Sequence, residues 1–123
     1  MANEINLAVS LQLQKGTLLE NFQLRGSFTL AAAAPLKAAG IASIAFAAHS
    51  AIPMAGVGTR GFALFRNLDT TNYVDVGVDV AAAFYPFARL LPGECAVVRL
   101  GTLAPYAKAN TAAVRLQYDI FDA

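Results

Sequence analysis

Few side chains in this sequence could do chemistry, and the most suggestive of them are carboxylates. Asp75 and Asp79 alternate with valines, so a strand would place both on one face, about 13 Å apart. That separation is too long for two carboxylates that act on the same bond. With Asp69 they could form a calcium cluster at a hairpin tip. The interpretation we favour is that these acids keep an exposed strand face soluble.

His49 and Cys95 are each the sole member of their residue type. A single imidazole cannot supply the set of ligands in a catalytic zinc site or a cupin-like metal site, and no motif places a nucleophile beside it. We expect a histidine in a loop or an interface. A lone cysteine excludes an internal disulfide, and we expect it to be a small buried apolar side chain. We therefore predict no enzyme, no cofactor and no metal.

The aromatic side chains offer a different function, the binding of a carbohydrate or a receptor. Tyr73 and Tyr85 are the first candidates for such a platform, but the chain contains no tryptophan. Packing in a core or an interface is the interpretation that we favour for these rings. A carbohydrate-binding or receptor-binding β module of a spike or fibre stays open as an alternative.

The composition restricts the class of protein. The chain has 123 residues, of which 57% are hydrophobic and 14% charged, with a net charge of +1. An average soluble domain has about 25% charged residues. The chain is too apolar for a disordered protein, and it has no basic block for nucleic acid. Its 26 alanines dilute every apolar stretch, so we expect neither a membrane span nor a signal segment.

Alternation of apolar and polar residues predicts strands along most of the chain. Residues 4–14 alternate without a break, and 22–30 follow with Gly26 on the inward face, which indicates a bulge or a close crossing. We predict a third strand over 41–48, with Ile44 and Phe46 inward, and a hairpin made by 61–67 and 73–79. Further strands are expected over 84–90, 95–100 and 113–121. About eight short strands predict an all-β fold, a single-domain antiparallel β-sandwich or jelly roll over 1–123.

The C-terminal half contains a run of turn and strand motifs in a familiar order. Asn67 to Gly77 reads NLDTTNYVDVG and Phe84 to Glu94 reads FYPFARLLPGE, with AVVRL and YAKA after them. This order, over residues 61–121, resembles small β-sandwich structural proteins of tailed bacteriophage virions. The resemblance implies a virion component made in the host cytoplasm, such as a capsid decoration (cement) protein or a tail or neck subunit. It implies no catalytic residue.

We therefore predict a capsid decoration protein that stabilises the shell through apolar contacts between subunits. The low charge fits surfaces that meet other protein. We expect a homo-oligomer, with a trimer favoured, and the major capsid protein or other virion proteins as partners, without nucleic acid or membrane. The segments 31–39 and 51–60 are the candidate contact segments. The candidate interface residues are Leu36, Lys37, Ile52, Met54, Val57, Arg60, Tyr73, Tyr85, Phe87 and Arg89.

Overall fold

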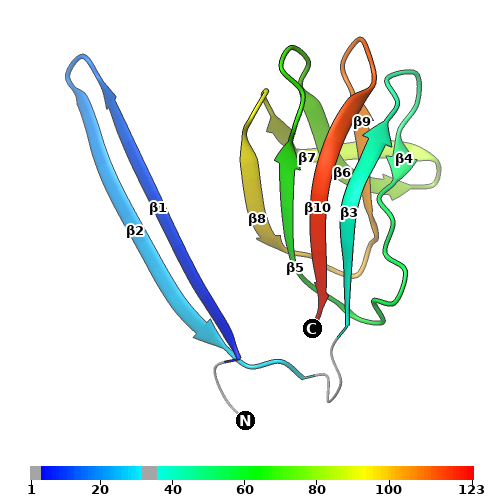
Figure 1. Ribbon diagram of the computed structural model, residues 1–123, viewed down its shortest axis with the longest axis horizontal. Coiled ribbons are helices and arrows are strands. Elements are labelled where there is room, and N and C mark those ends of the chain that lie inside the picture. Colours follow the sequence, from blue (N-terminus) through cyan, green and yellow to red (C-terminus); the bar gives the residue numbers. More distant parts are fainter. Residues whose placement is uncertain (1–3, 32–35) are drawn as a thin grey trace. The chain divides into compact units, whose positions relative to one another are not determined.

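The computed structural model describes residues 4–31 and 36–123, and these residues form antiparallel β-strands joined by turns (Figure 1). The chain divides into two compact units, Met1–Ala33 and Ala34–Ala123. The first unit holds a two-stranded sheet, and the second holds two four-stranded sheets. The single domain expected over 1–123 stays a prediction, and the sandwich is a property of the second unit. Part of the candidate contact segment 31–39, residues 32–35, lies outside the described residues.

The first unit is a long hairpin, which we call the arm. It pairs β1 (Ile5–Lys15) with β2 (Leu18–Phe28) in an unbroken register, from Ile5 opposite Phe28 to Lys15 opposite Leu18. The turn at its tip uses Gly16 in the left-handed region, with a φ of 59°. The register contains no bulge at Gly26. The close approach there comes from the ring of Phe28, which would lie 2.7 Å from a Cβ at that position.

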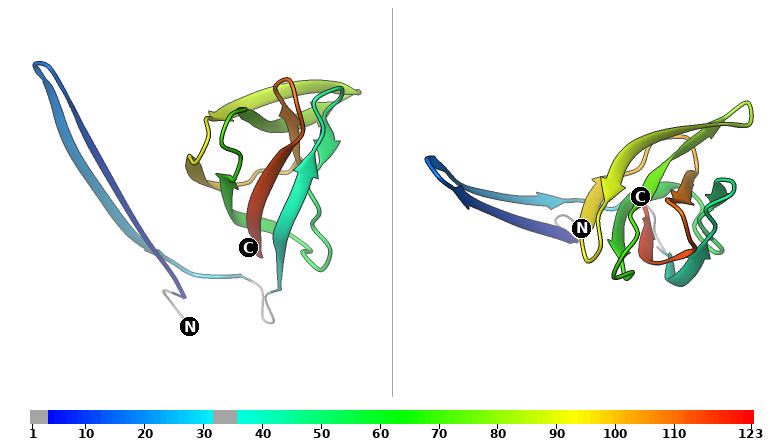
Figure 2. Two further views of the ribbon diagram at one scale, coloured as in Figure 1. Left: turned by 45° about the horizontal axis from the view of Figure 1, so that its top comes forward. Right: turned by 90° about the horizontal axis from the view of Figure 1, so that it is seen from above.

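The second unit is a sandwich of two antiparallel sheets, so the all-β prediction is confirmed (Figures 1 and 2). One sheet has the order β3 (Lys37–Ile44), β10 (Val114–Asp122), β5 (Arg60–Asn67), β8 (Cys95–Arg99). The other has the order β4 (Ser50–Ala51), β9 (Pro105–Ala109), β6 (Val74–Val80), β7 (Ala83–Leu90). The non-consecutive neighbours in both orders mean that the chain crosses repeatedly from one sheet to the other.

The core lies between these two sheets and follows the period-two pattern of the sequence. Along β10, the side chains from Val114 to Ile120 alternate between buried and outward positions. Phe65 of β5 and Val76 of β6, which come from opposite sheets, are each 1% exposed. Burying an apolar side chain of this size stabilises a fold by about 1.5–3 kcal/mol relative to leaving it exposed. The inward faces of the two sheets therefore supply the sandwich with its own core.

The hairpin predicted over 61–67 and 73–79 is wrong, because these segments lie in different sheets. Strand β5 pairs with β10 and β8, whereas β6 pairs with β7 and β9. The connection between them crosses the sandwich around Asn67, which is fully buried. Its Nδ2 donates to the carbonyl oxygens of Asn72 and Leu90 at 2.9 and 3.0 Å. A buried amide whose hydrogen bonds are all satisfied holds this crossing in place.

Two side chains lie outside the core positions that we predicted for them. Strand β3 ends at Ile44, so Phe46 lies beyond it and is 50% exposed. Cys95 is exposed because it opens β8, an edge strand, opposite the exposed Arg66 on the outer face of its sheet. Among the described residues, no helix has the length and hydropathy needed to cross a membrane.

Candidate interaction surfaces

The arm has one strongly apolar side, which we call the arm face. Residues directly opposite each other in an antiparallel pair point to the same side of the sheet. The register therefore collects most of the large apolar side chains of both strands on this face: Ile5, Leu7, Val9, Leu11, Leu13, Leu18, Phe22, Leu24 and Phe28. Lys15 and Glu20, near the tip, are the charged residues on this face, and Gly26 lies near its base. No described residue of the arm is buried.

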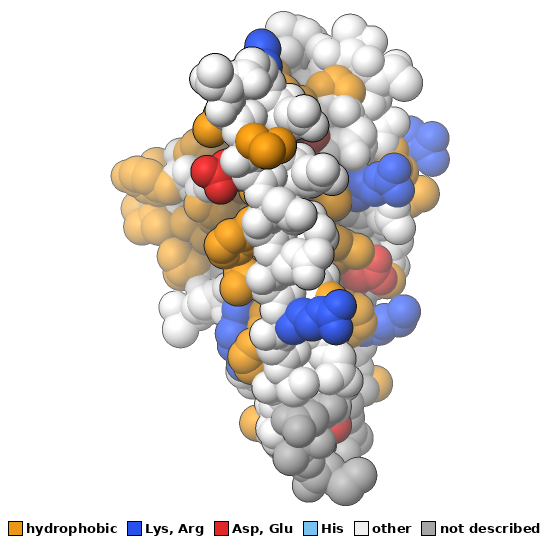
Figure 3. Space-filling model, turned by 90° about the vertical axis from the view of Figure 1, so that its left-hand side faces the viewer, with side chains coloured by type: hydrophobic (Ala, Val, Ile, Leu, Met, Phe, Trp, Pro, Cys, Tyr) orange, Lys and Arg blue, Asp and Glu red, His pale blue; other side chains and the backbone are white. Residues whose placement is uncertain are grey.

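The opposite side of the arm is polar and almost uncharged. It carries glutamines, asparagines and serines, with Arg25 as its one charged residue and Leu19 as its one large apolar residue. The hydroxyl of Ser27 donates to Oδ1 of Asn6, which lies directly across the hairpin, at 2.8 Å. In Figure 3, which looks onto the arm, backbone and uncharged polar side chains form a band down the middle of the view. The arm thus has one side suited to water and one suited to protein.

The sandwich brings two of the candidate interface residues together, Tyr73 and Arg89. The guanidinium of Arg89 lies 3.9 Å from the centre of the Tyr73 ring, and its Nε donates to Oδ1 of Asp75 at 2.8 Å. The hydrogen bond to Asp75 raises the pKa of Arg89 above its usual value. Because Arg89 covers one face of Tyr73, that ring face is closed to a sugar. Tyr85 lies at a different place, on β7 opposite Val78, and is exposed.

The side chains of His49 and Asp79 are in hydrogen-bond contact. Nε2 of His49 lies 2.5 Å from Oδ2 of Asp79, and the imidazole stacks on the ring of Phe84 with centroids 5.3 Å apart. The ring of Tyr106 lies at 5.5 Å on a tilted plane. The imidazole is therefore packed among aromatic rings against the β6–β7 hairpin. The contacts that the structure shows are thus those of a histidine packed against a carboxylate and two rings.

The three aspartates named from the sequence have separate partners. Asp75 binds Arg89, and Asp79 binds His49. Asp69 accepts from the backbone N–H groups of Asn72 and Thr71, and these bonds lower the pKa of its carboxyl from 3.8. Within residues 4–31 and 36–123, no group of three or more His, Cys, Asp or Glu side chains could hold a metal ion. Local turn formation therefore explains the position of Asp69.

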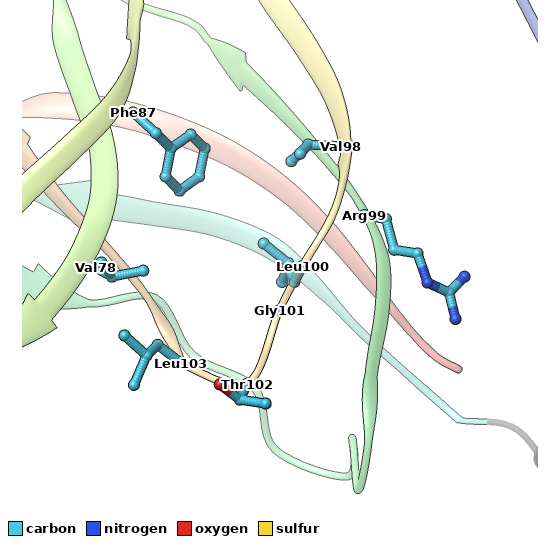
Figure 4. A pocket seen from close by; sticks show the side chains of 8 residues that line it. All are labelled: Val78, Phe87, Val98, Arg99, Leu100, Gly101, Thr102 and Leu103. Carbon is cyan, nitrogen blue, oxygen red and sulfur yellow. The ribbon is translucent and has the colours of Figure 1, made fainter.

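An apolar cleft opens at one margin of the sandwich, between strands β6 and β7 of one sheet and the end of β8 with the loop that follows it (Figure 4). Its volume is about 350 Å³. The ring of Phe87 and the side chains of Val98 and Leu103 point into it from different strands and loops. Phe87 and Leu103 are about half exposed. Phe87 is thus the candidate interface residue that lines this cleft.

The remaining candidate interface residues are distributed between the surface and the core. Ile52 is 2% exposed and belongs to the core, and Met54 and Val57 pack against that core from the loop before β5. Leu36 and Lys37 are exposed at the start of β3. Arg60 is half-buried and donates to the carbonyl oxygens of Gly101 and Thr102. Within the segment 51–60, Ile52, Met54 and Val57 therefore pack against their own sandwich, while most of the other residues are exposed.

Asp122 is a structural residue that the sequence did not single out. It is 7% exposed, and its Oδ1 accepts from the backbone N–H groups of Gly58 and Thr59 at 2.8 and 3.2 Å. Its Oδ2 accepts from Leu36 N–H at 2.9 Å. The pKa of this carboxyl lies below 3.8, mainly because of the bond from Leu36 and to a smaller extent because of those from Gly58 and Thr59. The side chain ties the last strand to the entry of the sandwich and to the loop before β5.

Comparisons of the chain with protein-family models, with curated proteins and with solved structures find no match. Function must therefore be argued from the surfaces described above.

Proposed function

We propose that this chain is a structural protein of a tailed-phage virion, acting as a capsid decoration protein and working as a homo-oligomer. The single observation that carries the self-associating part of this proposal is the arm face, which presents nine large apolar side chains without a core of its own. Contiguous exposed apolar surface of this kind marks a site of protein–protein contact. The virion part is supported by the motif resemblance over residues 61–121.

The sandwich fits the role of a rigid body that carries the arm. Its core is closed by two four-stranded sheets, and its buried polar side chains all have hydrogen-bond partners among the described residues. An adhesive protein needs a stable scaffold and an exposed apolar surface, and these two properties are found here in separate units. The exposed rings of Tyr85 and Phe87 offer a further apolar surface, on the sandwich itself.

Binding to phage shells tests the proposal. Emptied shells of a tailed phage that encodes this chain, stripped of the protein, are mixed with purified protein and sedimented. We expect the protein to sediment with the shells to saturation and to raise the temperature at which they rupture. The double variant Tyr85→Ser/Phe87→Ser tests whether the sandwich surface takes part, and Gln117→Ser, on the outer face of β10, is its control. Protein that stays in the supernatant at every shell concentration would contradict decoration.

A further inference from the structure

We propose that the arms of three copies of this chain close into one six-stranded antiparallel sheet around a three-fold axis, with the arm faces inward. This inference rests on the homo-oligomer of the proposed function and names the element that forms it. The occupant of the arm face is thus a second and a third copy of the same segment.

Among the described residues, the arm has no further strand along either edge and no buried side chain on its apolar face. A two-stranded hairpin is marginally stable in water, and a third strand or a packed face is needed to stabilise it. In an antiparallel pair, alternate backbone N–H and C=O groups point away from the partner strand. Among the described strands, β1 and β2 pair only with each other, so the outer edges of Ile5–Lys15 and of residues 18–27 have no strand beside them. Long free edges of this kind readily pair with another chain.

Copies of the arm related by rotation about an axis parallel to its length would cover the arm faces and pair the edges at the same time. In such a ring, β1 of each copy lies beside β2 of the next copy. Because β1 and β2 run in opposite directions, every new contact between copies is an antiparallel strand pair. The edges then hydrogen-bond to each other while the arm faces meet around the axis. The equal strand lengths, 11 residues each, let the edges match over their whole length.

Edge pairing fixes the number of copies. Two arms packed face to face would cover their apolar sides but leave all four edges open. Three is the smallest number of arms that surrounds an axis and pairs every edge. Gly26 leaves room for the Phe28 ring to fold back over its own arm, which reduces the volume of side chain near the base of the closed sheet. A ring of three also agrees with the trimer expected from the sequence.

The charged residues of the arm fit the ring, because they lie near its open end or on its outer side. Lys15 and Glu20 lie near the tip, where the closed sheet opens to water, and they are present in equal numbers in any ring of identical copies. Around the opening, each lysine has a glutamate of its own arm or of the next arm within reach. The uncharged polar side, with Arg25 as its one charge, faces solvent. No charge is therefore placed in the middle of the apolar interior.

The mass of the full chain in solution, measured by native mass spectrometry and light scattering, tests the ring. We expect a trimer for the wild-type chain. Leu11→Asp places a charge in the apolar interior, so we expect it to yield monomers. Gln12→Asp adds the same charge one residue away on the polar side and should remain trimeric. A wild-type monomer or dimer, or a trimer unchanged by Leu11→Asp, would overturn the proposal.

Exchanging the charges of Lys15 and Glu20 tests the ring even if Leu11→Asp unfolds the arm. Lys15→Glu puts like charges around the opening and should weaken the trimer. We expect the protein concentration at which the trimer dissociates to rise about tenfold. The double variant Lys15→Glu/Glu20→Lys restores opposite charges and should restore the wild-type value. Failure of the double variant to recover would contradict the placement of these two residues.

Shell binding separates this inference from the proposed function. Monomers that still bind and stabilise phage shells would contradict the ring and leave decoration standing. Trimers that ignore shells would contradict decoration and leave the ring standing.

Discussion

Leu11 of β1 lies directly opposite Phe22 of β2 on the arm face, and both side chains remain more than half exposed, at 57% and 52%. A cross-strand pair of large apolar residues ordinarily stabilises a sheet by packing against a further layer. The arm supplies no such layer within its own unit, because none of its described residues is buried. The pair lies on the face that we propose for assembly.

Truncation of a core ring should destabilise the sandwich. Phe65 is 1% exposed between the two sheets, and Phe65→Ala leaves a cavity there that we expect to cost about 3–5 kcal/mol in the free energy of unfolding. Urea denaturation followed by far-UV circular dichroism measures this loss. Phe46→Ala, the matched change at an exposed phenylalanine, should alter stability by about 0.5 kcal/mol or less. Equal effects of the two substitutions would contradict the assignment of the core.

The stability of the sandwich should fall in acid through Asp122. Its carboxylate accepts three backbone hydrogen bonds, and its folded pKa lies below the ordinary 3.8. Its contribution is therefore fully present above pH 3.8 and is lost as the pH falls through the lower folded value. Asp122→Asn should lower the melting temperature at neutral pH, and the difference from wild type should shrink below pH 3.8. Asp119→Asn, on the outer face of the same strand, is the control. A melting-temperature difference between Asp122→Asn and wild type that stays constant down to the lowest pH would count against this assignment.

The β6–β7 turn should become more stable when its backbone strain is relieved. Ala81 and Ala82 both have positive φ, at 52° and 66°, a region that costs a residue with a Cβ about 1–2 kcal/mol. Ala82→Gly should therefore raise the free energy of unfolding by about 1 kcal/mol in thermal or urea denaturation. Ala83→Gly, one residue later in strand β7, should instead lower it by about 0.5–1 kcal/mol. Destabilisation by Ala82→Gly would show that this turn is not strained.

Strand periodicity predicted the fold class, because each inward face of the sandwich carries the alternation of the sequence. The alternation of β10 from Val114 to Ile120 is a clear example. Which strands pair was harder to predict, since strand pairing depends on where a turn directs the chain. The segment after Asn67 contains the polar residues of a hairpin turn, yet the buried Asn67 amide directs it across to the other sheet.

The candidate sites were less predictable from sequence than the fold. Alternation in residues 4–14 predicts one apolar side, but it cannot show that this side meets no core within its own unit. Asp122 is the last residue of β10, and only the folded loops bring its three N–H donors to it. Ile52 belongs to the segment 51–60, which the sequence predicts to be a contact loop, whereas its position beside β9 buries it.

Hydrogen exchange of the arm amides, resolved by residue in the full chain, tests ring closure most directly. In an isolated hairpin only alternate amides are bonded, so every second amide along β1 and β2 would exchange rapidly. In a closed six-stranded sheet all of them are bonded. We predict slow exchange at consecutive residues of both strands in the wild-type chain, and fast exchange at alternate residues in Leu11→Asp. Alternating protection in the wild-type arm would contradict the account.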